Sequence, residues 1–197
     1  MNHCLSSLSY FVDQFYQFEI DSQLAFIALR DSLSTGQTMS KHKLIETCRA
    51  LNIKSENAVF IGHWHGLLPF MMKRENFIRS ATGIEKDKIW SDFSNYLNRD
   101  WNWNSKNLAI EDYTYDLNTD LIVNTSCEHM SDDWLKNVPS GCLLILQTTN
   151  FIHLEHINIQ QTLVHFLDSL CAFEIQFADE LDCDVYKRFT VVCKKRL

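Results

Sequence analysis

The chain has 197 residues, of which 46% are hydrophobic and 22% charged, and its formal net charge is −7. This composition is ordinary for a globular protein of about one domain, and it excludes a mainly disordered chain or a collagen. The acidic balance disfavours binding to nucleic acid or to an anionic membrane surface, because such partners attract basic surfaces.

Two further exclusions come from the cysteines and the N-terminus. The seven cysteines include no C-x-x-C pair, which argues against a disulfide framework and a structural zinc site. The N-terminal sequence Met-Asn-His-Cys-Leu lacks the basic and apolar regions of a signal peptide, and no apolar run is long enough to span a bilayer. We therefore expect a cytoplasmic protein with reduced thiols.

The N-terminal part of the chain has the pattern of helices. Apolar residues recur at helical spacing between Leu5 and Tyr16 and again between Leu24 and Leu29. Ser40 is a suitable N-cap for a third helix, whose apolar face ends at Leu51. Residues 1–55 are thus predicted to form an N-terminal helical cap.

After this cap, strands are predicted to alternate with helices. The apolar run Ala58–Gly62 predicts a first strand, and Leu68–Ser80 is compatible with a helix that Thr82–Gly83 ends. Second and third strands are predicted at Lys88–Asp92 and Leu108–Asp112, each ending in an acid.

The second half of the chain continues the alternation and closes with a hairpin. The predicted elements are a central strand at Asp120–Asn124, a short helix at Asp132–Asn137, a strand at Cys142–Gln147, a helix at Leu163–Leu170, and strands at Phe173–Leu181 and Val185–Cys193. Only three residues separate the last two strands, so they must form a hairpin that adds an antiparallel edge strand. The expected class is α/β, with a mostly parallel, Rossmann-like sheet over residues 56–197.

Ligands of such a sheet bind at the carboxyl ends of its strands, so the residues that follow the strands are the candidate site. The turn Gly62–Gly66 could offer backbone N–H groups to an anion, or Gly62 could merely permit the turn. Asp92 could accept hydrogen bonds from a ribose diol and Asp112 could meet an adenine amino group; the alternative is a solvated turn or a helix cap.

The segment after the central strand is the most polar of these. Asn124, Thr125, Ser126, Glu128 and His129 occur within six positions, and burying them unpaired would cost a few kcal/mol each. They therefore face solvent or build a polar pocket, and we favour the pocket because the preceding strand is expected to be buried.

Histidines are frequent at the same predicted edge. Asn150, His153, His156 and Asn158 follow the next strand, and together with His63, His65, Glu128 and His129 they form a histidine-rich rim. Three histidines and a carboxylate could bind zinc or iron if they converged. No spacing demands such a site and the HExxH signature is absent, so we expect a polar pocket without metal.

From about Asn57 to the C-terminus, these features in this order resemble the class I S-adenosylmethionine-dependent methyltransferases. The features are a glycine turn after the first strand, acids after the second and third, a polar motif after the fourth, and the C-terminal hairpin. The family's first motif reads acid-x-Gly-x-Gly-x-Gly. Here Phe60 stands in place of the acid and Trp64 in place of the middle glycine, whereas Gly62 and Gly66 remain.

The resemblance implies S-adenosylmethionine as the cofactor and methyl transfer to oxygen or nitrogen of a small, polar or anionic metabolite. Cofactor contacts are then expected from Gly62, His63, Trp64, Gly66, Asp92, Asp112, Asn124, Thr125 and Ser126. Substrate contacts are expected from Asn150, His153 and Asn158. His129 has a suitable ordinary pKa for a general base, Glu128 would orient it or bind a substrate ammonium, and His156 is the reserve base.

Three alternatives stay open at this point. A nicotianamine-synthase-like enzyme has the same fold but transfers an aminobutyrate group. The missing acid and the missing middle glycine would also suit a non-catalytic binding protein. A nicotinamide-dependent oxidoreductase is disfavoured by the absence of Gly-x-Gly-x-x-Gly and by the C-terminal hairpin. The sequence makes no prediction of the oligomeric state.

Overall fold

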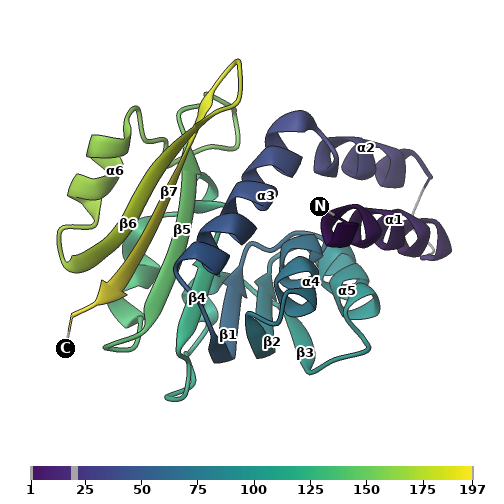
Figure 1. Ribbon diagram of the computed structural model, residues 1–197, viewed down its shortest axis with the longest axis horizontal. Helices are drawn as coiled ribbons and strands as arrows, with labels where there is room; N and C mark the ends of the chain where they lie inside the picture. The colour runs from purple at the N-terminus through teal and green to yellow at the C-terminus, as the bar shows by residue number, and fades with distance from the viewer. Residues whose placement is uncertain (1, 19–21, 197) are drawn as a thin grey trace.

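One mostly parallel sheet organises the chain in the computed structural model, which describes residues 2–18 and 22–196, without the side chains of residues 2–5, 22 and 25. The strand order is β3-β2-β1-β4-β5-β7-β6 (Figure 1). The strands are β1 (Ser55–Ile61), β2 (Ile78–Glu85), β3 (Trp103–Asn107), β4 (Leu121–Asn124), β5 (Leu143–Thr149), β6 (Phe173–Asp182) and β7 (Lys187–Lys195). This confirms the predicted α/β class.

The C-terminal hairpin is confirmed, with one difference in its placement. β7 pairs antiparallel with both β5 and β6, whereas the pairs among β1 to β5 are parallel. The antiparallel strand is therefore an inner strand, and β6 forms the edge. The difference arises because β7 is apolar enough to be covered on both faces, with Val191, Val192 and Cys193 all fully buried.

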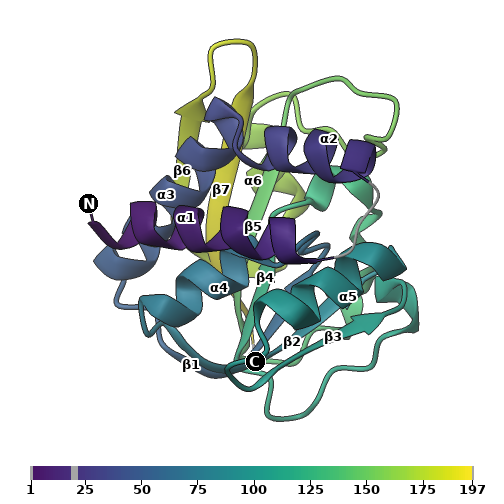
Figure 2. The ribbon, with the colours of Figure 1, turned by 90° about the vertical axis from the view of Figure 1, so that its right-hand side faces the viewer.

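Helices cover both faces of the sheet (Figures 1 and 2). They are α1 (Asn2–Gln17), α2 (Ser22–Ser32), α3 (Thr35–Ala50), α4 (Leu67–Arg74), α5 (Lys88–Leu97) and α6 (Leu163–Ser169), with short 3₁₀ turns at Ile110–Asp112, Cys127–His129 and Asp132–Asn137. Successive residues of a strand point to opposite faces, so the sheet divides the apolar side chains into two clusters. Ala58 and Phe60 pack against α1 to α5, whereas Val59 and Ile61 pack against α6 and the 3₁₀ turn Asp132–Asn137.

The three N-terminal helices share their apolar core with the sheet. Phe11, Phe15 and Leu44 belong to the same buried cluster as residues of β1, β2 and β4. The helical nature of this region is confirmed, and the division into domains at residues 1–55 and 56–197 stays a prediction. The helix α3 starts earlier than predicted, at Thr35, so Ser40 lies inside it, buried, rather than at its N-cap.

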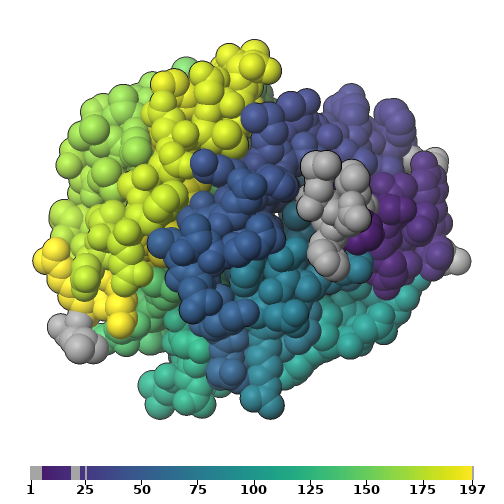
Figure 3. Space-filling model, in the orientation of Figure 1, coloured from purple at the N-terminus to yellow at the C-terminus, as the bar shows by residue number. Residues whose placement is uncertain are grey.

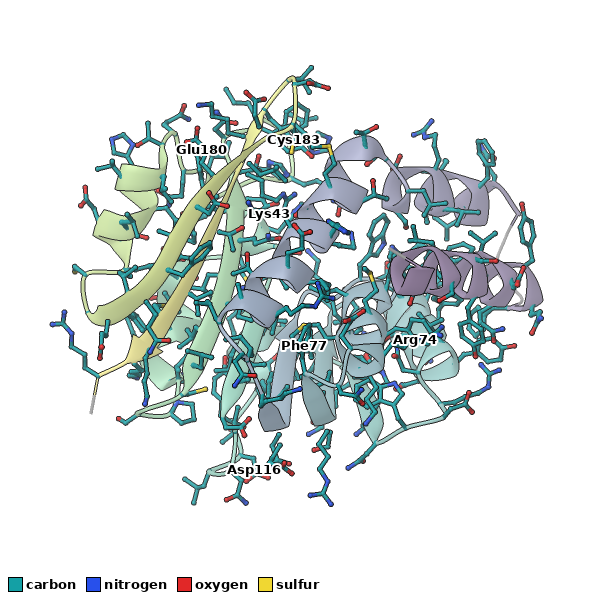
Figure 4. The ribbon with its side chains drawn as sticks, viewed as in Figure 1. Lys43, Arg74, Phe77, Asp116, Glu180 and Cys183 are labelled. Carbon is teal, nitrogen blue, oxygen red and sulfur yellow. The ribbon has the colours of Figure 1, made fainter. Side chains whose placement is uncertain are left out.

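Helix α3 crosses one face of the molecule beside the C-terminal strands (Figure 3). The Ser40 hydroxyl donates to Oε1 of Gln147 on β5 at 3.0 Å. Lys43, labelled in Figure 4, forms an ion pair with Asp179 of β6 at 3.1 Å. These polar contacts fix α3 against β5 and β6, at the edge where the strands end.

The structure corrects the predictions for the stretch from residue 75 to residue 112. The predicted helix ends at Arg74, and Ile78–Glu85 is β2; the predicted strand Lys88–Asp92 lies inside α5; and β3 precedes the predicted strand Leu108–Asp112, part of which is a 3₁₀ turn. Helix α5 forms because the Asp87 carboxylate accepts hydrogen bonds from the backbone N–H of Ile89 and Trp90, and because Trp90, Phe93 and Leu97 line its buried face.

Two further observations concern the exclusions drawn from the sequence. No helix formed by residues 2–18 and 22–196 is long and apolar enough to cross a membrane. The cysteine side chains that the structure describes, at positions 48, 127, 142, 171, 183 and 193, are all free thiols.

Gly66 is a position where an added methyl group should be poorly tolerated. Its φ is +78°, and a Cβ there would lie 2.3 Å from Ser94 Oγ and 2.8 Å from Asn98 Nδ2. We expect Gly66→Ala to lower the free energy of unfolding by about 2–4 kcal/mol, measured by urea denaturation. Gly141→Ala is the matched control, because its φ is +77° in the turn before β5, and it should lose only ~1–2 kcal/mol. Equal losses in the two variants would contradict the clash at Gly66.

Candidate functional site

A cavity of about 1010 Å³ lies at the carboxyl edge of the sheet. Its walls come from the turn after β1, the end of β2, the segments after β3 and β4, the loop after β5, and from α2, α3 and β7. A pocket for one small ligand usually has ~300–1,000 Å³, so this cavity has room for a cofactor and an acceptor together. The rule that ligands bind at the strands' carboxyl ends therefore located the cavity correctly.

The turn from β1 to α4 carries unusual backbone conformations. Gly62 (φ +57°), Trp64 (φ +52°) and Gly66 (φ +78°) all adopt left-handed values, and Trp64 does so without the freedom of a glycine. A Cβ on Gly62 would lie 3.2 Å from Ser126 Cβ, and the Ser126 hydroxyl donates to the Gly62 carbonyl at 3.1 Å. The structure thus brings together two of the predicted cofactor segments, the turn and the residues after β4.

Glu85 at the end of β2 is the acid that sequence reasoning missed. Its carboxylate is buried and accepts the Trp64 N–H at 2.9 Å and the Asp87 N–H at 3.0 Å. Burial raises the pKa of Glu85, and the two backbone donors oppose that rise. The sequence prediction placed the second strand at Lys88–Asp92, so it pointed to Asp92. With β2 at Ile78–Glu85, the same rule points to Glu85.

Asp92 and Asp112 are not at strand ends. Asp92 is exposed on α5, where its carboxylate pairs with Lys88 at 2.6 Å. Asp112 is exposed in the 3₁₀ turn after β3. Neither lines the cavity, whereas the neighbouring Ala109 and Ile110 do. The cofactor contacts of Asp92 and Asp112 were predicted on the assumption that the second and third strands end at these residues. That assumption is wrong, because β2 ends at Glu85 and β3 ends at Asn107.

His63 and His65 are buried and hold the turn in place. The His63 ring nitrogen Nε2 is hydrogen-bonded to Ser105 Oγ of β3 at 2.9 Å, and His65 Nε2 is hydrogen-bonded to Ser32 Oγ of α2 at 2.5 Å. Burial lowers the pKa of His63 to about 3 and holds the pKa of His65 well below its ordinary value. Both rings are consequently neutral near pH 7, as burial without a carboxylate partner requires.

The polar segment after β4 forms a pocket wall, as predicted, and hydrogen bonds of Asn124, Ser126 and the Glu128 backbone hold it. Asn124 is fully buried, and its Oδ1 accepts the Ser126 N–H at 2.9 Å. The Glu128 carbonyl accepts the N–H groups of Ile157 and Asn158, at 2.8 and 3.1 Å. The loop after β5 is therefore fastened to the segment after β4 by backbone hydrogen bonds.

The three predicted catalytic residues converge. One ligand atom from each of Glu128, His129 and His156 lies within 4.8 Å of the others. The two imidazole centroids are 4.6 Å apart, and His156 Nδ1 is hydrogen-bonded to the Phe151 carbonyl at 2.7 Å, which leaves its Nε2 as the acceptor. Burial lowers the pKa of His129, although Glu128 opposes this shift.

The predicted substrate residues are less well placed. Asn150 exchanges hydrogen bonds with the backbone of Lys187, and His153 is exposed with its Nδ1 accepting the Glu155 N–H at 3.4 Å. Asn158 donates to Asp132 Oδ1 at 2.8 Å. Of all the predicted site residues, those that line the cavity are Gly62, His63, Trp64, Thr125, Ser126, Glu128 and His129; those that do not are Gly66, Asp92, Asp112, Asn124, Asn150, His153, His156 and Asn158.

Two cations on the cavity wall were also missed. Lys41 projects from α3, and Arg188 from β7 is buried, with its Nη1 donating to the Thr125 carbonyl at 3.0 Å. Arg188 Nη2 lies 3.7 Å from Glu128 Oε1. In the sequence, Arg188 belongs to the basic pair Lys187–Arg188, which by itself indicates only a solvated surface. Its position inside a buried strand is the signal that points to the cavity instead.

The comparisons with known proteins identify the fold. No protein-family model matches the chain, and no curated protein matches its sequence. Among solved structures, the geranyl diphosphate C-methyltransferase from Streptomyces coelicolor A3(2), in complex with Mg²⁺, a geranyl thiolodiphosphate and S-adenosyl-L-homocysteine, is similar with a TM-score of 0.65 and 12% identity, over 85% of this chain and 80% of that one.

Two other solved structures are similar to a comparable degree. The N-methyltransferase NodS from Bradyrhizobium japonicum WM9 has a TM-score of 0.63 and 11% identity, over 81% of this chain and 96% of that one. The [4+2]-cyclase SpnF has a TM-score of 0.63 and 11% identity, over 84% and 85%. The chain thus has the fold of the class I S-adenosylmethionine-dependent methyltransferases.

The buried histidines make stability sensitive to acid. The folded-state pKa of His63 lies below that of an unfolded histidine, so the stability that neutral His63 confers is present above pH ~6.5 and is lost as the pH falls toward 3. At pH 5 the loss from His63 should be on the order of 2 kcal/mol relative to pH 7, measured by urea unfolding at both pH values.

Two variants separate this histidine from the titrating carboxylates. His63→Gln should show a smaller loss between pH 7 and pH 5 than the parent, because it has no imidazole to protonate. His42→Gln, altered at an exposed site on α3, should keep the parent's loss. An unchanged loss in His63→Gln would show that this histidine does not set the acid sensitivity.

Proposed function

We propose that the protein is an S-adenosylmethionine-dependent methyltransferase acting on oxygen or nitrogen of a small, polar or anionic metabolite. One observation carries the proposal. The cavity gathers a glycine-flanked turn after β1, a buried acid at the end of β2 and a polar segment after β4 at one edge of a sheet with the methyltransferase fold. A neighbour with that fold was solved with S-adenosyl-L-homocysteine.

The residues present fit this cofactor. The turn Gly62–Gly66 would lie along it, Glu85 would face its ribose, Ala109 and Ile110 would border its base, and Thr125 and Ser126 would lie beside its amino-acid part. Gly62 supports the fit, since a side chain there would fill the narrow space toward Ser126. The cofactor supplies a methyl group already activated on a sulfonium, so the protein has mainly to align the acceptor and remove its proton.

Proton removal is assigned to His129. Its ring lines the cavity and its lowered pKa leaves it neutral near pH 7, so a lone pair is available for the acceptor's proton. Glu128 stabilises the resulting imidazolium, because its carboxylate raises the pKa of His129. Glu128 Oε2 is buried without a hydrogen-bond partner in the described part of the chain, so it can accept from an ammonium or hydroxyl of the acceptor. His156 remains the reserve base.

Glu128, His129 and His156 also have the composition of a divalent-metal site. We favour the metal-free base because Arg188 lies 3.7 Å from the Glu128 carboxylate and already offsets its charge. Bringing a dication next to that guanidinium would add repulsion that two neutral imidazoles do not compensate.

Other reactions on this fold remain alternatives. SpnF, one of the neighbours, is described as a [4+2]-cyclase, so the fold alone does not set the reaction. Aminobutyrate transfer would use the same cofactor, and mass spectrometry distinguishes it because the product gains an aminobutyrate rather than a methyl group. A non-catalytic protein would bind the cofactor without turnover, and the convergence of Glu128, His129 and His156 argues against it.

The proposal includes a small-molecule partner and a cytoplasmic location. The net charge of −7 supports a small-molecule acceptor rather than nucleic acid or a membrane surface. A cytoplasmic location agrees with the free thiols at the described cysteines.

The acid that binds the ribose can be identified by calorimetry with S-adenosyl-L-homocysteine. Glu85→Gln should weaken binding by ~1–3 kcal/mol, because a charged acceptor is lost at the end of β2. Asp92→Asn is the matched control: the carboxylate is exposed on α5 and away from the cavity, so its affinity should equal that of the parent. A loss in Asp92→Asn but not in Glu85→Gln would restore Asp92 as the ribose ligand.

The role of His129 is tested by turnover with any acceptor found by screening. His129→Gln should lower kcat by ~100-fold or more while the affinity for S-adenosyl-L-homocysteine stays unchanged, as expected for loss of a general base. His153→Gln, at an exposed ring outside the cavity, is the control and should retain activity. Turnover within a few-fold of the parent would exclude His129 as the base, and activity that EDTA abolishes and Mn²⁺ or Zn²⁺ restores would assign the cluster to a metal instead.

A further inference from the structure

Two cations on one wall of the cavity touch neither the methyl group nor the proton that the proposed reaction moves, although one of them, Arg188, offsets the charge of Glu128. Lys41 comes from α3 and Arg188 from β7, two elements far apart in the sequence. Arg188 is buried and Lys41 is half-buried, and the two charges lie close enough for Arg188 to lower the pKa of Lys41. The Glu128 carboxylate, 3.7 Å from Arg188, supplies one negative charge for two cations, so the wall keeps an excess of positive charge, and removing unpaired charge from water is unfavourable.

Arg188 is only partly satisfied by the protein. Nη1 donates to the Thr125 carbonyl, and Nη2 lies 3.7 Å from Glu128 Oε1, beyond hydrogen-bond distance. Nε is buried and has no hydrogen-bond partner among the described residues. A guanidinium has five N–H groups in a fork that matches carboxylate and phosphate oxygens, so the free donors of Arg188 suit a bidentate anion.

Lys41 lacks a counter-charge altogether among residues 2–18 and 22–196. Its amine donates to Gln37 Oε1 at 2.6 Å, one turn earlier in α3, and no carboxylate lies within 4.0 Å of it. Asp31, one of the acids that line the cavity, is paired with Arg30 at 3.0 Å. Burial, together with Arg188, lowers the pKa of Lys41 to about 7.

Both cations are held in place without a ligand. The hydrogen bond to Gln37 holds the Lys41 amine, and the pairing of β7 with β5 and β6 holds the backbone of Arg188. Arg188 stands opposite Thr149 of β5 and Leu181 of β6, so its backbone is fixed from both sides. Lys41 lies in the middle of α3, next to Ser40, whose hydroxyl is bound to β5. A site whose charged groups are positioned in advance loses little entropy when an anion binds.

We propose that Lys41 and Arg188 form a subsite for an anionic group, a carboxylate or a phosphate, of the acceptor substrate. This inference rests on the proposed methyl transfer for the identity of the acceptor. The subsite lies beside Glu128, the neighbour of the base His129, so an acceptor held there by its anionic end presents its other polar group to the base. The class of substrate is thus a small metabolite with one anionic end and one protonated nucleophile.

Binding of inorganic phosphate, followed by calorimetry, tests the subsite. The parent should bind phosphate at pH 6.5, and Lys41→Met should weaken this binding at least tenfold. Lys43→Met is the matched control on the same helix, since Lys43 is paired with Asp179 outside the cavity, and it should bind as the parent does. Arg188→Lys keeps the charge but loses the fork, and should also bind more weakly. Equal binding by all four proteins would overturn the proposal.

The pH dependence gives a second, independent measurement. Sulfate replaces phosphate in this measurement because its charge is constant from pH 6.5 to 9; its binding to the parent should weaken over this range because Lys41 loses its proton. Within that range, the weakening should be much smaller in Lys41→Met. The charged or titratable groups that interact electrostatically with Lys41 are Arg188, which stays charged over this range, and His65, which stays neutral, so neither reproduces this profile. A parent profile identical to that of Lys41→Met would contradict the assignment.

The cofactor carries a carboxylate of its own, so one arm of the experiment assigns the anion to its source. Saturating S-adenosyl-L-homocysteine should leave phosphate binding intact if the subsite serves the acceptor. Competition between the two would give the subsite to the cofactor's carboxylate and overturn the acceptor assignment. Failure of S-adenosyl-L-homocysteine to bind at all, with Lys41-dependent phosphate binding retained, would refute the methyltransferase and leave the anion subsite standing.

Discussion

The cavity depends on a turn that would not keep its shape alone. Between β1 and α4, left-handed backbone at Gly62, Trp64 and Gly66 departs from what an isolated chain prefers, and the non-glycine Trp64 adds strain on the order of 1 kcal/mol. Four other elements hold it. The Trp64 N–H donates a hydrogen bond to Glu85, and the Asn98 amide donates one to the Gly66 carbonyl. The rings of His63 and His65 are hydrogen-bonded to Ser105 and Ser32. The floor of the site is therefore set by buried polar side chains from β2, β3, α2 and α5, and the strain is concentrated where a ligand is expected to approach.

Much of the architecture could be predicted from the sequence. The apolar runs within Ala58–Gly62 and Asp120–Asn124 are typical of strands that are buried on both faces of a sheet. The failure at β2 has a local cause. Ile78–Glu85 mixes polar and small residues, and its Gly83 looks like a helix stop, yet the glycine is needed because a Cβ there would lie 2.5 Å from His63 Nε2. Only the tertiary contact explains that glycine. Helix α5 was lost through the same error, although Asp87 and the spacing of Trp90, Phe93 and Leu97 are ordinary helix signals.

The candidate site also contains residues that could be predicted from the sequence and residues that only the folded structure brings together. Residues that follow strands in sequence, such as Gly62 and Glu128, could be found by reading the chain, because the carboxyl ends of parallel strands meet at one edge. Lys41 and Arg188 could not be paired that way, since a helix before the sheet and a strand at its far end meet only in the folded molecule. Lys41 also illustrates a conflict between stability and ligand binding. A half-buried amine without a carboxylate partner costs the free protein some stability, and a site that binds an anion gives a reason to keep it.

The strand order has a consequence for biosynthesis. β7 lies between β5 and β6, so β6 is made first but finds no partner in the sheet until β7 has left the ribosome. Until then the edge of β5 is open, the apolar side chains of the C-terminal hairpin are exposed to water, and the wall that holds Arg188 does not exist. Translation thus delivers a nearly finished sheet with an unprotected edge, which is the state in which chains of this kind pair wrongly or require a chaperone. The anion subsite proposed for Lys41 and Arg188 is therefore incomplete until β7 has paired with β5.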